Sequence, residues 1–199
     1  MDRTVADAAK RPKILAFAGS TREGSHNKRL IRVAAEAARA AGAEVTLIDL
    51  RDYPMPPYDG DLEAKGLPAP VVALKELFKA HDGLLISAPE YNGGMSGMLK
   101  NVIDWLSRRG DDERALAAFS GKFAGLMSAS PGRLGGISGL GQLRHVLTTV
   151  GVLVVPQQRG IDAADMAFNE DGRLKDPAQQ AAIEAIAARL VDLVRRHAD

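Results

Sequence analysis

The chain has 199 residues, a formal net charge of +1 and no cysteine. This length is typical of one domain with a sizeable hydrophobic core. The near-neutral charge removes the electrostatic reason to expect a nucleic acid or an acidic membrane surface as a partner. The absence of cysteine excludes disulfides, thiolate zinc sites, cysteine-bound iron–sulfur clusters and a thiol nucleophile.

Residues 1–12 mix charged residues with alanines and contain no apolar segment. We therefore expect a disordered leader there, rather than a signal peptide or a membrane anchor. No apolar run approaches the length of a transmembrane helix. These features predict a single cytoplasmic domain over residues 13–199.

Short apolar runs alternate with amphipathic segments along the rest of the chain. The runs typical of buried strands are residues 13–18, 44–50, 83–88, 122–129 and 152–155, the last ending at Pro156. Helical spacing predicts helices over residues 28–41, 71–80, 97–108, 143–150 and 176–197, with Asp176 as N-cap of the last. This alternation predicts an α/β fold with a parallel sheet covered by helices on both faces.

Four connections between these elements are long or unusual in composition. Residues 51–70 are rich in proline and glycine, and we expect them to border a site or a subunit interface. Residues 110–114 are expected to form an exposed charged loop, residues 130–141 a glycine-rich loop and residues 157–172 a polar loop.

Residues 19–27 (GSTREGSHN) join the first strand to the first helix. A helix N-terminus offers unpaired backbone N–H groups and a partial positive charge, both of which favour a phosphate. Ser20 and Ser25 add hydroxyl donors, Asn27 an amide donor and Arg22 a charged fork. We therefore predict a phosphate cradle; the alternative is a capped turn, because Ser and Asn are also good N-caps.

Two further loops follow the third and fourth strands: residues 89–94 (PEYNGG) and residues 130–141 (SPGRLGGISGLG). Parallel strands end at one edge of the sheet, so all three loops should converge on one crevice. Asp49 could act as the acid of a dinucleotide site, but residues 19–27 match neither GxGxxG nor GxxxxGK[ST]. The first loop suits a single terminal phosphate better than a dinucleotide or a triphosphate.

The segments GSTREGSHN, PEYNGGMSGMLKNVIDWLSR and SASPGRLGG, in this order, resemble the NAD(P)H-dependent FMN reductase family, which includes quinone, azo-dye and chromate reductases. The resemblance covers residues 13–161. It implies a flavodoxin-like three-layer sandwich with a five-stranded parallel sheet in strand order 2-1-3-4-5. The pair Ser96-Gly97 departs from the Pro-Gly that family members commonly have before this helix.

The resemblance also implies FMN as cofactor and NADPH or NADH as co-substrate. The FMN phosphate would be held by the first loop, and the flavin ring would lie between the other two loops. The residues implied are Ser20, Arg22, Ser25, Asn27, Pro89, Glu90, Tyr91, Asn92, Gly93, Ser128 and Ser130. Glu90 and Tyr91 have a second interpretation as strand-end turn residues. Met95, Met98 and Trp105 are expected either to line the flavin or to pack in a core or interface.

The implied activity is an oxidoreductase with a ping-pong cycle, in which NAD(P)H delivers hydride to FMN and an acceptor then takes its place. Quinones, azo dyes, chromate and free flavin are the expected acceptors, and the chain is expected to form a homodimer or homotetramer. We assign no catalytic side chain and interpret His26 as a solvated residue at a helix start. The alternatives are a non-catalytic FMN electron carrier and a flavin-free binding module.

Overall fold

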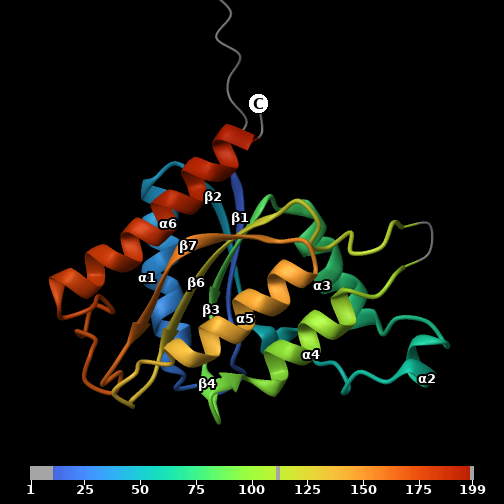
Figure 1. Cartoon of the computed structure of the whole chain (residues 1–199), viewed down its shortest axis with the longest axis horizontal. Helices are drawn as coiled ribbons and strands as arrows, with labels where there is room; N and C mark the ends of the chain where they lie inside the picture. Colours follow the sequence, from blue (N-terminus) through green and yellow to red (C-terminus); the bar gives the residue numbers. More distant parts are fainter. Residues whose placement is uncertain (1–10, 111–112, 198–199) are drawn as a thin grey trace, which may run out of the picture.

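A parallel sheet of five strands forms the centre of the computed structural model, which describes residues 11–110 and 113–197 (Figure 1). The strands are β1 (Lys13–Ala18), β2 (Glu44–Ile48), β3 (Gly83–Ser87), β6 (Phe123–Ala129) and β7 (Leu153–Ile161). Their order in the sheet is β2-β1-β3-β6-β7. Strands β4 (Glu90–Tyr91) and β5 (Gly94–Met95) lie outside this sheet and form a separate two-stranded hairpin. The predicted flavodoxin-like order 2-1-3-4-5 is confirmed.

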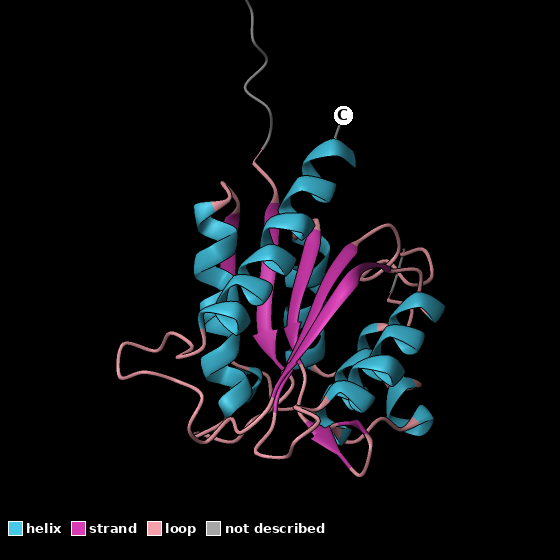
Figure 2. Cartoon of the chain, turned by 60° about the vertical axis from the view of Figure 1, so that its left-hand side comes forward, coloured by secondary structure: helices cyan, strands magenta, loops and turns pink. Residues whose placement is uncertain are grey.

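Helices cover both faces of this sheet (Figure 2). One face packs on α1 (His26–Ala40) and α6 (Pro177–His197), and the other on α3 (Ala69–Ala80), α4 (Gly97–Leu106) and α5 (Ile137–Thr149). The side chains of β1 alternate between the two layers: Ile14 and Ala16 join the first core, while Leu15 and Phe17 join the second. A strand buried on both faces needs apolar residues at every position, which explains the continuous apolar run.

The described fold begins immediately before β1. Pro12 is buried, and its carbonyl accepts a hydrogen bond from the Glu44 amide at 2.9 Å. The remainder of the predicted leader, residues 1–10, lies outside the described residues. None of the helices in residues 11–110 and 113–197 has the length and apolar character needed to span a bilayer.

The predicted end of the last strand at Pro156 is wrong, because β7 continues to Ile161 and replaces the start of the predicted 157–172 loop. The pairing shifts between Ala124 and Leu126 of β6, so Pro156 lies in a bulge of the edge strand, where its missing N–H is tolerated. Arg144 of α5 donates to the carbonyls of Val154, Val155 and Pro156 at 3.3, 2.8 and 3.2 Å. The guanidinium thereby satisfies carbonyls that the bulge removes from the ladder.

Several predicted helix boundaries are also wrong. Helix α5 begins at Ile137, so residues 137–141 of the predicted 130–141 loop are helical, and α1 begins at His26. The 51–70 connection contains a short helix, α2 (Gly60–Glu63), and its first two residues belong to a 3-10 turn, η1 (Leu50–Asp52). Asp176 does cap α6, since its Oδ1 accepts from the Ala178 amide at 2.8 Å. The spacing of apolar residues located these helices, but it does not determine their terminal residues.

The 51–70 connection packs against α4 rather than extending freely. The side-chain amide of Asn101 and the indole N–H of Trp105 both donate to the Pro56 carbonyl, at 2.9 and 2.8 Å. Trp105 is fully buried, and its ring packs edge-on against the ring of Tyr58, with the two ring centroids 5.1 Å apart. Of the two interpretations of Trp105, core packing is therefore the one that the structure supports.

The segment after α4 is held by a partly buried cluster of charges, although residues 110–114 were expected to be exposed. Residues 111–112 lie outside the described residues. The Glu113 carboxylate lies 2.6 Å from the ammonium groups of both Lys75 and Lys79 on α3. Lys75 is only 3% exposed and also donates to the Arg108 carbonyl at 2.6 Å. Hydrogen bonds from Lys75 and then Lys79 lower the pKa of Glu113 from 4.5 to about 2.

We predict that Glu113→Gln lowers the free energy of unfolding near neutral pH, and that this difference shrinks as the pH falls. Because the folded-state pKa of Glu113 is depressed to about 2, its carboxylate stabilises the fold above about 4.5 and stops doing so as the pH falls toward about 2. Urea unfolding of both proteins over this pH range measures the effect. Glu44→Gln is the control, since that residue is exposed on β2 and is remote from Lys75 and Lys79 in the sequence. A difference that stays constant over the whole range would contradict the assignment.

Candidate functional site

Three loops lie together at the carboxyl edge of the sheet, as the parallel topology requires. Phe17, Ile86 and Leu126 are register partners across β1, β3 and β6, so these strands end at the same level. The loops that follow them are residues 19–27, residues 89–95 and residues 130–136. The predicted convergence of the three loops is therefore seen in the fold.

The first loop presents donors around the N-terminus of α1. Ser20 and Ser25 are 7% and 3% exposed, and Ser25 is the N-cap but makes no side-chain capping hydrogen bond. The Ser25 carbonyl accepts from the amides of Lys28 and Arg29. Within the described residues, the amides of His26 and Asn27 have no hydrogen-bond partner. The loop thus keeps unpaired donors at a helix N-terminus, as an anion site requires.

Asn27 ties this loop to two strands. Its side-chain amide donates to the Ala129 carbonyl at 2.9 Å, and its carbonyl oxygen accepts from the Ser87 hydroxyl at 2.8 Å and the Ala129 amide at 3.0 Å. The residue is 3% exposed. Both lone pairs of its oxygen are occupied, so Asn27 holds the loop in shape and has one amide hydrogen left for a ligand.

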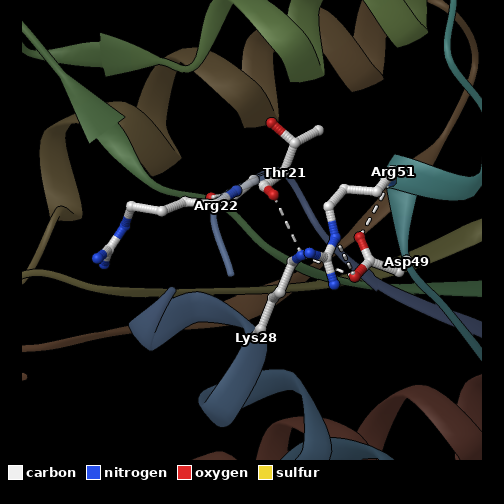
Figure 3. Close-up of polar contacts among 6 residues, drawn as sticks. Thr21, Arg22, Lys28, Asp49 and Arg51 are labelled. Carbon is white, nitrogen blue, oxygen red and sulfur yellow. Dashed lines mark hydrogen bonds and ion pairs between the residues drawn. The ribbon is translucent and has the colours of Figure 1, made fainter. Parts of the chain in front are cut away.

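A charged cluster lies on the other side of the first loop (Figure 3). The Lys28 ammonium lies 2.7 Å from Asp49 and 3.4 Å from the Thr21 carbonyl, and the Arg51 guanidinium lies 3.1 Å from Asp49. Burial alone would raise the pKa of Asp49, but the hydrogen bonds from Lys28 and Arg51 outweigh burial and lower it. Asp49 is thus already neutralised by two cations, whereas Arg22 points away from the cluster (Figure 3).

His26, expected to be solvated, is half-buried instead. Its Nδ1 is buried and has no hydrogen-bond partner among the described residues. Burial, followed by the nearby charges of Arg22 and Arg29, lowers the pKa of this imidazole. The neutral ring therefore leaves Arg22 as the exposed cation of the loop.

The second loop is a tight β-hairpin, which sequence reasoning missed. Glu90 pairs with Met95 and Tyr91 with Gly94, and the turn residues Asn92 and Gly93 have φ angles of 53° and 76°. Positive φ at both turn positions defines a type I′ turn, for which Asn-Gly is the preferred sequence. The Asn92-Gly93 dipeptide was the available signal. Pro89 is buried, whereas Tyr91 is 58% exposed.

Ser96, the departure from the family pattern, fastens this hairpin to the first loop. Its hydroxyl donates to the Gly19 carbonyl at 2.6 Å and accepts from the Leu99 amide at 3.2 Å, so it caps α4. The Gly19 amide in turn donates to the Ser87 carbonyl at 2.9 Å. A Cβ at Gly19 would lie 3.0 Å from Leu99, so the absence of a side chain permits this close approach.

In the third loop the two predicted serines differ. The Ser128 hydroxyl is 0% exposed, lies beneath Gly136 and has no partner among the described residues. Ser130 is half-buried, and its Oγ accepts from the Gly132 amide at 3.2 Å. Gly135 and Gly136 have φ angles of 60° and 84°. Ser130 is therefore near the surface, whereas Ser128 supports the loop from below.

The cavities found in the structure only partly coincide with the three loops. One of about 960 Å³ lies between α1 and α6, lined among others by Arg32, Glu36 and Glu184, and contains no residue of the loops. Another of about 650 Å³ runs between α4 and α5 and includes Met95 and Gly97, next to the hairpin. The donor chemistry, rather than cavity size, therefore identifies the candidate site.

Together, the strand order and the layers of helices define a flavodoxin-like fold, with a candidate anion site at the N-terminus of α1. The family model described as NADPH-dependent FMN reductase matches residues 12–165. The chain therefore belongs to the NADPH-dependent FMN reductase family, a family of oxidoreductases.

Individual relatives agree with this assignment. The chain is 36% identical over 186 residues to an NAD(P)H-dependent FMN reductase of Pseudomonas aeruginosa, covering 92% of this chain and 96% of that protein. It is 35% identical over 144 residues to the quinone reductase of Escherichia coli, covering 72% of this chain and 73% of that protein. Among solved structures, the flavoenzyme FerB of Paracoccus denitrificans, an NAD(P)H:(acceptor) oxidoreductase, is similar with a TM-score of 0.80, 27% identity and coverage of 94% and 98%.

We predict that Asn27→Ala lowers the free energy of unfolding by about 2–4 kcal/mol, because it leaves the Ser87 hydroxyl and both backbone groups of Ala129 without partners. Urea unfolding monitored by circular dichroism measures the loss. Asn169→Ala is the control, since Asn169 is exposed. Equal stability of the two variants would contradict the structural role of Asn27.

Proposed function

We propose that this protein is an FMN-dependent NAD(P)H:acceptor oxidoreductase. The first loop carries the proposal, because the amides of His26 and Asn27 lack partners within the described residues and lie beside the hydroxyls of Ser20 and Ser25. A terminal phosphate suits these donors, since it accepts several N–H and O–H hydrogen bonds at once. Family membership supports FMN as the molecule that bears this phosphate.

The phosphate would be bound by Ser20, Arg22 and Ser25, with Asn27 holding the loop in shape and offering its remaining amide hydrogen. The ring would lie against the hairpin, where Pro89, Glu90, Tyr91, Asn92 and Gly93 form one wall. Ser130 would border the other side, with Ser128 beneath it. The orphaned Ser128 hydroxyl and the unpaired amides fit a polar ligand at this edge.

When bound, FMN supplies hydride acceptance from NADPH or NADH and electron transfer to a second substrate. The chain's own residues hold the phosphate, orient the ring and leave one of its faces open to two substrates in turn, which gives ping-pong kinetics. Preorganised backbone N–H groups of the loops favour negative charge at the ring. An open face of this kind suits quinones, azo dyes, chromate and free flavin as acceptors.

We also propose a homodimer or homotetramer and a cytoplasmic location. Tyr58 and Leu62, each 36% exposed on the 51–70 connection, are apolar side chains suited to a subunit contact. Light scattering of the purified protein measures the oligomeric state.

The first test is activity. Protein purified with added FMN is expected to be yellow and to oxidise NADPH or NADH much faster when benzoquinone is present. A colourless protein that does not bind FMN contradicts the proposal. A yellow protein with negligible turnover favours the electron carrier instead.

Arg22→Ala is predicted to weaken FMN binding by about 1.5–3 kcal/mol, roughly 10- to 100-fold in Kd, because one charge-assisted hydrogen bond to the phosphate is lost. Riboflavin, which has no phosphate, should bind both proteins equally. Quenching of flavin fluorescence measures both affinities. Arg189→Ala on α6 is the control for the change in net charge, since that side chain is 47% exposed. Unchanged FMN affinity would place the phosphate elsewhere.

A further inference from the structure

Helix α5 lacks a cap of its own. Its N-cap is Gly136, which has no side chain to accept from the first-turn amides, and its first turn contains no acidic residue. A carboxylate from the second loop takes this place: Oε2 of Glu90 accepts from the Gly139 amide at 2.7 Å. A negative charge at a helix N-terminus also interacts favourably with the helix dipole.

The hairpin and α5 fit closely around this hydrogen bond, and β4 lies beside the start of α5 (Figure 1). A Cβ at Gly139 would lie 3.1 Å from the Gly94 carbonyl and 3.2 Å from Cγ of Glu90. A Cβ at Gly94 would lie 2.7 Å from the side-chain oxygen of Gln142. Glycine at both positions therefore lets the hairpin approach the helix closely enough for the carboxylate to reach the Gly139 amide.

We infer that Glu90 is a positioning residue that fixes the second loop to α5 and the third loop, and so sets the width of the slot for a flavin ring. The effect on flavin binding rests on the proposed function, whereas the hydrogen bond between Glu90 and the Gly139 amide does not. Glu90 was predicted to contact the flavin through the second loop. Its Oε2 accepts from α5, so Glu90 would border a flavin through the rest of the residue, beside Tyr91, Asn92 and Gly93.

The hydrogen bond is tested on the protein without flavin by amide exchange at Gly139, followed by NMR. Glu90→Ala should speed this exchange by about tenfold or more, as expected for the loss of a hydrogen bond to a charged group. Glu90→Gln keeps an acceptor oxygen at the same place and should restore most of the protection. Glu44→Ala, which removes an exposed carboxylate on β2, is the control and should leave Gly139 unchanged.

The consequence for binding is tested with FMN and riboflavin on the same variants. Glu90 acts on the wall beside the ring and not on the phosphate. Glu90→Ala should therefore weaken the binding of both flavins by the same factor, about tenfold. Glu90→Gln should lie within about threefold of the unaltered protein. Arg22→Ala should weaken the binding of FMN but not of riboflavin. The ratio of the FMN affinity to the riboflavin affinity therefore distinguishes an effect on the phosphate loop from an effect on the wall of the ring.

Unchanged exchange at Gly139 in Glu90→Ala overturns the inference, as does a Glu90→Gln variant that is as impaired as Glu90→Ala. If the unaltered protein binds no flavin, the proposed function fails, while the exchange measurement still decides whether Glu90 holds the hairpin. Circular dichroism of each variant separates a local effect from loss of the fold.

Discussion

The site depends on one buried carboxamide. Where parallel strands give way to loops, their last backbone groups lose the partners that the sheet ladder supplied, and a buried group left unpaired is costly. Asn27 meets this need because one amide group offers a donor and an acceptor in fixed geometry. It pairs with both backbone groups of Ala129 at the end of β6 and with Ser87 at the end of β3. The start of α1 is therefore fixed relative to both strands.

Further hydrogen bonds extend this anchorage to the other two loops. Ser96 joins the start of α4 to the first loop through the Gly19 carbonyl, and Glu90 joins the hairpin to α5. Each link is a side chain from one loop bonded to the backbone of another element, so the three loops form one connected unit. A binding site held in this way before the ligand arrives loses little conformational entropy on binding. The sequence departure at Ser96 thus has a structural role, since proline could not make either hydrogen bond.

The sequence predicted an α/β fold with a parallel sheet because that information was local, whereas the strand order came from the resemblance to a known family. Runs such as Lys13–Ala18 can be buried on both faces only in a parallel sheet between helix layers, and the order of elements then determines the site edge. The errors occurred where distant residues decide. Pro156 remains within a strand because a bulge and Arg144 accommodate it, and α5 begins early because Gly139 packs on the hairpin. The role of Asn27 depends on partners 60 and 102 residues away, which no local pattern shows. The hairpin is different, because the dipeptide Asn92-Gly93 is itself a local signal for its tight turn.

The placement of charge around the first loop bears on how a nearly neutral chain could hold a phosphate as proposed. Lys28 and Arg51 share Asp49, which balances one of their two positive charges on the β2 side of the loop. His26 has a lowered pKa, so its ring adds no cation near neutral pH. The positive potential of the loop then comes from the helix N-terminus, from the remaining charge of this cluster and from Arg22, which has no ion-pair partner within the described chain. Backbone dipoles bind an anion only at short range and in a fixed direction, whereas a cluster of free lysines would attract any acidic surface. These features of the loop would therefore suit a small anion that fits the helix end, as the proposed function requires.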